Sequence, residues 1–403
     1  MSSASFSDLI VVQDGRPRLP AAVHPLPDLL DMTAEQVLAA FRDSQRHDFT
    51  AIVGQAEKPG CTLHGLFSEL RDRTPPDHPF HRIALFSPGA LERLFLDLHD
   101  HVMSHPVWRH PFFVRVFEGR IDPSQIASFA IAYFNQIKNT RQCVALAIGR
   151  FNGLMDLPYG SLNEHVSEIT QIALAQLVAD EYGVGSHAVE TYPDLGHLLR
   201  ARTHMVMYRQ LFGGLGIAAA DQDQPMLWGV ADNVLIQRLV AGHPAFSALE
   251  SLSSVGLGME WGVPEFFSLL LGGLIRVSAR ERLALTAHDL DVFIAHVRYD
   301  VLHAVSVMLV TSLHMNVPTD VGVVKNACNM LMAGRYAMMG DLYRHVFGQS
   351  CPTLAEIGLD PRYRLTDRRI ETLLIEARAG ISPARVRHGQ DYRHSRGVPF
   401  VFA

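Results

Sequence analysis

From Ala90 to about residue 347, apolar residues recur three and four positions apart in one segment after another. This spacing matches the 3.6 residues of a helical turn, whereas the apolar and polar alternation of a half-buried strand is scarce. Short polar or glycine-containing joints separate most segments, which favours helices packed antiparallel to their neighbours. The pattern predicts helices over residues 91–105, 123–151, 162–181, 194–214, 225–241, 245–256, 264–276, 288–314 and 318–347.

The two ends of the chain lack this regular spacing. The N-terminal region is rich in proline and broken by turn signals such as DGRPRLP and RTPPDHP, with one helix expected after Thr33, a suitable N-cap. After Gly348 the sequence becomes rich in proline and arginine, with little periodicity. We therefore expect an all-α chain with a partly helical extension (1–94), a helical bundle (95–350) and a C-terminal tail (351–403).

Composition and charge exclude several classes of protein. The chain has 403 residues, of which 48% are hydrophobic, so it can bury a large core. Its net charge is -6 and it has no dense run of lysine and arginine, which argues against nucleic acid as a partner. The first residues lack the pattern of a secretory signal, so a cytoplasmic location is expected. The apolar stretch at 266–277 is shorter than the roughly 20 residues that span a membrane.

The four cysteines do not indicate a covalent framework. Cys61, Cys143, Cys328 and Cys351 lie far apart and form no C-x-x-C pair, so neither disulfides nor a thiolate zinc site is expected. Several of them should be reduced thiols in the core. The glycine-rich motifs of nucleotide-binding proteins and the G-x-S-x-G motif of serine hydrolases are also missing at any convincing strand-to-helix junction.

Three polar residues share one stripe of an otherwise apolar helix. In LDVFIAHVRYDVLHAVSVML, His296, Asp300 and His303 are spaced i, i+4 and i+7, on the same face as Val292. A single histidine on such a face is more often a hydrogen-bonded core residue. Two imidazoles that flank a carboxylate at this spacing instead favour iron or manganese, because buried groups of this kind need partners.

One helix cannot complete such a site, so carboxylates must come from other segments. Asp180 and Glu181 end a predicted helix in LVADEYGVG, and Glu260 lies in LGMEWGVPEFF, just before a helix that Pro264 helps to start. Taken singly, an acidic pair at a helix end is usually a solvated terminus, and Glu260 is compatible with a surface position. Their combination with the stripe is what favours a metal site.

These motifs together resemble the haem-oxygenase-like diiron oxidases, a family of iron-containing redox enzymes. FIAHVRYDVLHA matches the H-x3-D-x2-H pattern of the last metal-binding helix of that family. DEYGVG resembles its earlier carboxylate and Y-G-x-G segment, THMVMYRQLFGGLGI its histidine-led helix with His204 at the ligand position, and GMEWGVP its middle glutamate. The resemblance covers about residues 95–350 and implies a seven-helix haem-oxygenase-like bundle.

The resemblance also implies a cofactor and an activity. It suggests two Fe(II) ions per chain, O2 as co-substrate, an unknown electron donor and a homodimer. The expected enzyme is an oxidase or oxygenase of specialised metabolism that acts on a small amino-acid-like substrate, by N-oxygenation or by oxidative C-C cleavage or decarboxylation. No catalytic residue beyond the metal ligands is implied. The implied ligands are Glu181, His204, Glu260, His296, Asp300 and His303.

Several alternatives stay open at this point. The gap between DEYGVG and His204 is longer than the family pattern, so His187 and His197 are rival ligands; His204 is preferred because the following residues match best. A cofactorless relative of the same bundle would bind an organic ligand without metal. An iron-storage protein would carry Glu-x-x-His in two helices, a pair that is not found. A haem protein would use His101 or His105 as the axial ligand.

Overall fold

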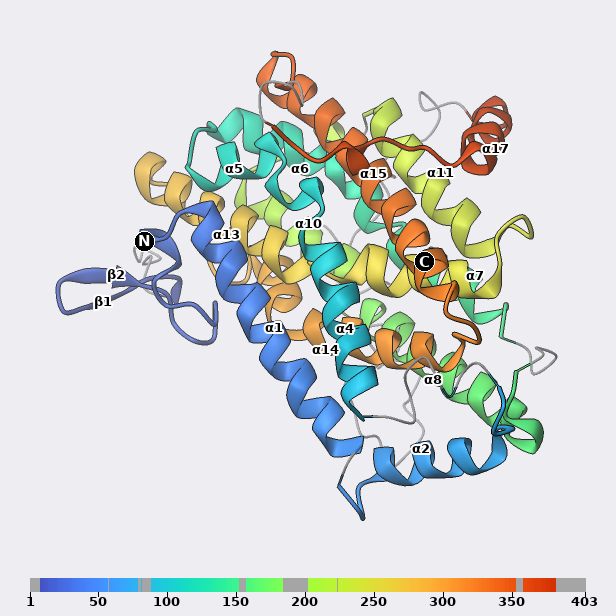
Figure 1. Cartoon of the computed structure of the whole chain (residues 1–403). Helices are drawn as coiled ribbons and strands as arrows, with labels where there is room; N and C mark the ends of the chain where they lie inside the picture. The colour runs from blue at the N-terminus through green and yellow to red at the C-terminus, as the bar shows by residue number, and fades with distance from the viewer. Residues whose placement is uncertain are drawn as a thin grey trace, which may run out of the picture.

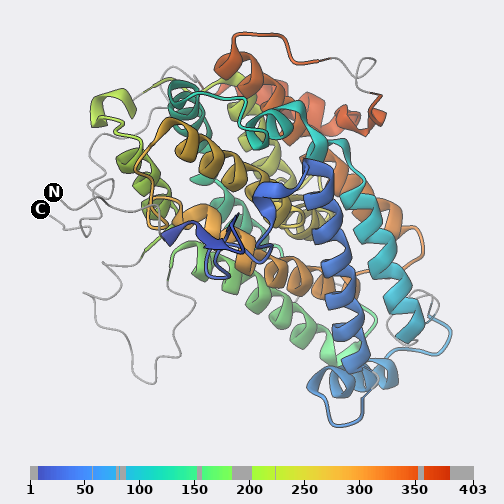
Figure 2. The same cartoon turned by 90° about the vertical axis from the view of Figure 1, so that its left-hand side faces the viewer.

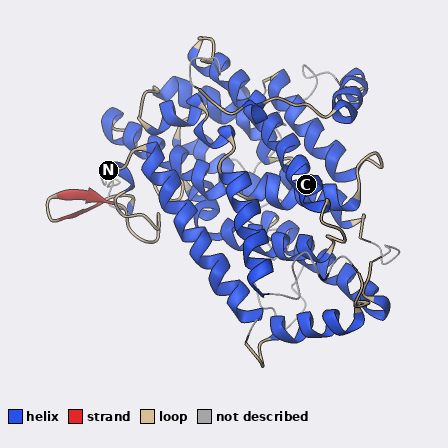
Figure 3. Cartoon of the chain, viewed as in Figure 1, coloured by secondary structure: helices blue, strands red, loops and turns tan. Residues whose placement is uncertain are grey.

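The computed structural model describes residues 8–56, 58–78, 81, 88–151, 157–183, 202–222, 224–352 and 358–381. Helices form nearly all of its regular structure, and a two-stranded hairpin projects from one side (Figures 1 and 3). The predicted all-α fold is confirmed. The helices are α1 (Ala34–Ala56), α2 (Thr62–Arg73), α4 (Pro88–Met103), α5 (Pro111–Phe117), α6 (Pro123–Ile137), α7 (Thr140–Ile148), α8 (Asn163–Glu181), α10 (His204–Gly214), α11 (Trp228–Gly242), α12 (Ala248–Ser253), the π-helix η6 (Ser254–Glu260), α13 (Val263–Glu281), α14 (Asp291–Leu313), α15 (Asp320–Phe347) and α17 (Arg368–Ala379). Short 3-10 turns are η2 (Leu29–Asp31), η3 (Pro106–Arg109), η4 (Gly160–Leu162), η5 (Ala219–Gln222) and η7 (Pro361–Tyr363).

The successive helices α12, η6 and α13 run through the centre of the molecule, with a turn between η6 and α13. Every residue from Ser251 to Ile275 is buried, because apolar side chains surround these helices on all sides. By length and composition Ala248–Glu281 could cross a membrane, yet 89% of its most apolar window is buried inside the molecule. Such extensive burial is typical of a helix in the core of a protein. Cys143 and Cys328 are also buried, and all four cysteines are free thiols, as predicted.

A tight turn at Gly262 joins η6 to α13. Gly262 has φ of 76°, and a Cβ atom at this position would lie 2.6 Å from Cζ2 of Trp108, so both the conformation and the packing require glycine. Pro264 lies in the first turn of α13, as the sequence predicted. The turn determines where the preceding residue Glu260 is placed relative to α13.

The helix predicted over residues 123–151 is in fact two helices, and this detail of the prediction was wrong. α6 begins as expected, with Asp122 as N-cap in a capping box and Pro123 behind it. The break follows Ile137, where the side chain of Asn139 donates to Gln237 Oε1 at 3.1 Å and accepts from Arg238 Nε at 2.7 Å. These bonds tie Asn139 to α11 at the point where α6 has ended and α7 has not yet begun.

The N-terminal region packs into the main core instead of standing apart. Its hairpin pairs β1 (Val11–Gln13) with β2 (Arg16–Arg18) across Asp14 and Gly15, which both have positive φ, as a two-residue turn requires. α1 lies beside α4 and contacts α13 (Figure 2). Since α4 runs across residue 94, the predicted boundary of the extension falls within a helix, and the division into separate units stays a prediction.

The C-terminal region contains a helix that was not predicted from the sequence. α17 buries Ile370 and Leu374 in a second apolar cluster that also includes residues of α7, α8 and α11. Arg369 of this helix pairs with Glu250 at 2.6 Å. Ile370, Leu373 and Leu374 recur at helical spacing and all contact this cluster, so the segment does carry an amphipathic signal, which the sequence analysis missed.

Candidate metal centre

The polar stripe of α14 faces the interior of the bundle. His296 and Asp300 are buried, with 7% and 3% of their surface exposed, and His303 is partly buried. Oδ2 of Asp300 lies 4.0 Å from Nε2 of His296, and its Oδ1 lies 3.5 Å from Nδ1 of His303. The predicted i, i+4, i+7 arrangement therefore places the carboxylate between the two imidazoles.

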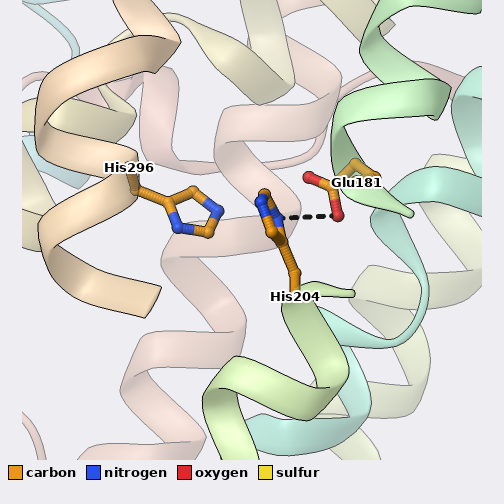
Figure 4. Close-up of side chains that lie close together, drawn as sticks. All are labelled: Glu181, His204 and His296. Atoms are coloured by element: carbon orange, nitrogen blue, oxygen red, sulfur yellow. Dashed lines mark ion pairs between the residues drawn. The ribbon is translucent and has the colours of Figure 1, made fainter. Parts of the chain in front are cut away.

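The ends of two further helices meet this stripe. Glu181 is the last residue of α8, and His204 is the first residue of α10, which Thr203 caps by accepting from the backbone N–H of Val206. Nδ1 of His204 lies 3.0 Å from Oε2 of Glu181 (Figure 4). The rings of His204 and His296 are 4.5 Å apart between centroids.

A compact set of possible ligand atoms results from this convergence. One ligand atom each of Glu181, His204 and His296 lies within 4.8 Å of the other two. Figure 4 shows that these side chains come from three different helices and point toward one another. The residues that the sequence singled out at widely separated positions are thus brought together by the fold.

Glu260 approaches the same cluster from the end of the π-helix η6. The side chain is buried, and this burial is the main reason why its pKa rises to about 7. The charge of His303 lowers this pKa and that of Glu181 raises it, so the electrostatic neighbours of Glu260 are members of the cluster. π-helical turns of this kind are frequent at functional sites.

Hydrogen bonds hold the two histidines of α14 in defined orientations. Nδ1 of His296 lies 2.6 Å from the backbone oxygen of Val292, and the ring stacks on Phe267 with centroids 4.3 Å apart. Nε2 of His303 lies 2.8 Å from Oδ2 of Asp180. Backbone and carboxylate partners of this type orient metal-binding histidines. Nε2 of His296 and Nδ1 of His303 are therefore the nitrogens available to the cluster.

Asp180 had no role of its own in the sequence analysis. It was recognised only as one half of an acidic pair at a helix end. In the structure its side chain accepts from Gln176 at 3.0 Å and contacts His303, while the neighbouring Glu181 faces His204. The two carboxylates point to different partners because successive residues of a helix differ by about 100° in direction.

The pKa values within the cluster are shifted in opposite directions. Burial lowers the pKa of His296 to about 3, with a further contribution from His204. Burial also lowers that of His303, but the hydrogen bond to Asp180 and the charge of Asp300 outweigh it and raise the pKa to about 9. The chain thus holds one imidazole neutral and favours the charged form of another.

The acidic members are also perturbed. Burial raises the pKa of Asp300 well above its usual value. Burial would raise the pKa of Glu181 as well, but the charge of His204 outweighs it and the pKa is lowered; the same pair raises the pKa of His204 against the effect of its burial. Several buried ionisable groups therefore depend on one another for charge balance.

The donor set fits a metal ion. Among the described residues, Oδ2 of Asp300 and Nδ1 of His204 are buried and have no hydrogen-bond partner, since the contact of His204 with Glu181 has the distance of an ion pair but not the angle of a hydrogen bond. Buried polar atoms normally have partners, so these two lack what a cation would supply. Carboxylate oxygens with imidazole nitrogens suit iron or manganese.

Four other histidines were alternatives in the sequence analysis, and the structure describes two of them. His187 and His197 fall outside the described residues, so the choice of His204 over them stays a prediction. Nε2 of His105 lies 3.1 Å from the backbone oxygen of Arg362, and Nε2 of His101 lies 3.0 Å from Oδ1 of Asn329. Both histidines thus have structural partners away from the cluster. Neither is favoured as the axial ligand of a haem.

Comparisons with known proteins give little beyond this geometry. No family model matches the sequence, and no curated protein matches it. Among solved structures, the chain is similar to a TenA homologue from Pseudomonas syringae pv. tomato, with a TM-score of 0.45 and 9% sequence identity over 63% of this chain and 92% of that one. The functional interpretation therefore depends on the cluster itself.

Proposed function

We propose that this chain is a non-haem diiron, O2-dependent oxidoreductase of the haem-oxygenase-like type, acting on a small amino-acid-like substrate in specialised metabolism. N-oxygenation and oxidative C-C cleavage or decarboxylation both remain within the proposal, as do a separate electron donor, a homodimer and a cytoplasmic location. The bundle would hold two Fe(II) ions between its central helices. The proposed ligands are Glu181, His204, Glu260, His296, Asp300 and His303.

One observation carries the proposal. Ligand atoms of Glu181, His204 and His296, from α8, α10 and α14, lie within 4.8 Å of one another, with Asp300 beside His296. Within the part of the chain that the structure describes, Oδ2 of Asp300 and Nδ1 of His204 have no hydrogen-bond partner. Buried polar atoms normally have partners, and a cation would supply one to each of these two atoms. Two cations would neutralise the three carboxylates and engage the free nitrogens.

The chain's own residues would position and protect this centre. The backbone oxygen of Val292 and the ring of Phe267 hold the imidazole of His296, while Asp180 holds that of His303. Apolar residues such as Val292 and Phe267 surround the buried members of the cluster. Bound iron would supply one-electron chemistry and activate O2, which no side chain of the cluster does alone.

Iron binding is the first property to measure. The purified chain is loaded anaerobically with Fe(II), desalted and assayed for iron per chain, then mixed rapidly with O2 while the visible spectrum is recorded. We expect about two irons per chain and a transient coloured species. His303→Ala and Glu260→Gln should lower the iron content while leaving the helical circular dichroism unchanged, because each removes a ligand and not a core contact.

A matched control is a buried histidine at the far end of α14. His314 is also buried, and its Nε2 lies 2.8 Å from Oγ1 of Thr170, outside the cluster. His314→Gln should keep the wild-type iron content. If the wild type takes up no iron, the proposal fails and a cofactorless pocket for an organic ligand becomes the better explanation. Equal iron loss in the control would mean that the cluster is not the site.

A further inference from the structure

Arg335 of α15 is a charged side chain in the interior of the bundle. Only 6% of the residue is exposed, and its Nη2 donates to the backbone oxygen of Met259 at 3.0 Å. Its Nη1 is also buried, and no described residue offers it a hydrogen-bond acceptor. The guanidinium therefore retains an unused donor group that faces no water.

The carboxylate of Glu260 acts on the charge of Arg335 from a distance, without a direct ion pair. Within the described part of the chain Arg335 forms no ion pair with a carboxylate, and burial lowers its pKa. The guanidinium lies 5.5 Å from the ring centroid of Trp108 and 5.3 Å from that of Phe266, which compensate only part of the lost hydration. An isolated buried cation is strongly disfavoured unless something pairs with it.

Another buried arginine differs from Arg335 in its hydrogen bonding. Arg209 is 1% exposed, and its Nη1 donates to Oε1 of Gln222 at 2.8 Å, while its guanidinium lies 4.6 Å from the centroid of Phe134. The two arginines share burial and an aromatic neighbour. They differ in that the protein supplies a side-chain acceptor to Nη1 of Arg209 and none to that of Arg335.

Arg335 lies at one edge of the candidate metal centre. Met259, whose backbone oxygen it contacts, immediately precedes Glu260. The charges of Arg335 and Glu260 influence each other, and Arg335 also interacts electrostatically with the buried Tyr133 of α6. A group bound to Nη1 would thus lie between the π-helix, α6 and α15, close to the ligands.

We propose that Arg335 receives the carboxylate of the substrate through Nη1 and so fixes the substrate beside Glu260. This inference rests on the proposed function, because it assumes that the cluster is the reaction centre. The ligand class is a monocarboxylate of amino-acid or short fatty-acid type, whose anion supplies the missing charge partner and whose apolar part contacts the aromatic rings of Trp108 and Phe266. A guanidinium is well suited to a carboxylate by both charge and geometry.

The competing explanation is that Arg335 only secures the backbone of η6 by its bond to Met259. The two explanations predict opposite effects on stability. Replacing an unpaired buried charge with an apolar side chain of similar length is often neutral or stabilising. If the charge is kept for a ligand, the unfolding temperature of Arg335→Met should equal or exceed that of the wild type. If the charge secures the backbone, the unfolding temperature should be well below that of the wild type.

Ligand binding is measured on the full chain, both iron-free and loaded anaerobically with Fe(II). The probes are acetate, hexanoate and L-norleucine, each compared with its amide, which keeps the shape and removes the anion. Calorimetry gives the affinities, and tryptophan fluorescence reports on the site because Trp108 lies next to Arg335. For at least one pair we expect the carboxylate to bind roughly 30-fold or more tightly than the amide.

The variants decide whether Arg335 causes this preference. Arg335→Met should abolish it, Arg335→Lys should retain part of it, and the control Arg209→Met should leave it unchanged. Two outcomes would overturn the inference. The first is that no probe carboxylate binds in a way that depends on Arg335. The second is that Arg335→Met lowers the unfolding temperature and leaves the preference for the carboxylate intact. Iron content is counted in the same samples. Two irons with no preference would overturn this inference alone, whereas a preference without iron would overturn the proposed function alone.

Discussion

Glu265 is a buried carboxyl group whose ionisation should set part of the pH dependence of stability. It lies on α13 with 0% exposure; its Oε1 accepts from Nε2 of Gln45 at 2.7 Å, and its Oε2 has no partner. Burial raises its pKa from 4.5 to about 7, against smaller opposing effects of its hydrogen bonds, including that from Gln45. The residue also links α1 to the central helix.

The sign and size of the effect follow from linkage. The folded state holds this proton more tightly than the unfolded state, so the contribution to stability is complete below pH 4.5 and is lost as the pH rises through 7. With about 1.4 kcal/mol for each pH unit between the two pKa values, the loss is about 3 kcal/mol. Glu265→Gln removes the ionisation and should therefore gain about 3 kcal/mol over the wild type between pH 4.5 and pH 8.5.

The assay is urea unfolding of wild type and variant, with a chelator present, followed by tryptophan fluorescence at four pH values across this range. The quantity of interest is the difference in free energy of unfolding between the two proteins, because other titrating groups cancel in it. Glu371→Gln on the exposed face of α17 controls for the change in net charge. A difference for Glu265→Gln that stays constant with pH would refute the reasoning.

Two further substitutions test the surroundings of the centre. Asp180→Asn removes the carboxylate that holds the ring of His303 at 2.8 Å. Measured in competition with a chelator, Fe(II) binding should weaken by roughly 10- to 100-fold, with little effect on the free energy of unfolding. Unchanged affinity for Fe(II) would show that the His303 ring needs no such support. Gly262→Ala introduces a Cβ atom 2.6 Å from the Trp108 ring at a φ of 76° and should cost roughly 3 kcal/mol in urea unfolding. Gly322→Ala, where a Cβ meets nothing within 4 Å, is its control, and equal losses in both would contradict the packing argument.

The sequence predicted those parts of the fold that are encoded in local patterns. The N-cap Asp122 with Pro123 correctly marked the start of α6, and Pro264 that of α13. The stripe on α14 was predicted from spacing alone, because helical geometry fixes which residues share a face. The structure then placed this stripe in the interior, as expected from its apolar neighbours.

Other features depend on contacts between distant segments and left no local signal. α6 ends just before Asn139, which bonds to α11, and nothing in the neighbouring residues marks a break. Asp180 and Glu181 contact separate histidines because of how α8 packs in the bundle, next to α14. This packing cannot be inferred from the local sequence. Arg335 could not be distinguished from a surface arginine, since its burial results from the packing of α15 against the rest of the bundle.

The π-helical turn before Glu260 has a consequence for how such a protein changes over generations. An α-helix bonds each residue to the fourth one before it, and a π-helix to the fifth, so the segment Ser254–Glu260 accommodates an extra residue in its turn. Deleting a single codon there would convert it to an ordinary α-helix and rotate Glu260 by about 100° relative to the residues before it. The carboxylate would then leave the cluster while the helix itself persisted. The loss of a single codon would therefore remove this glutamate from the centre and leave the architecture of the bundle unchanged.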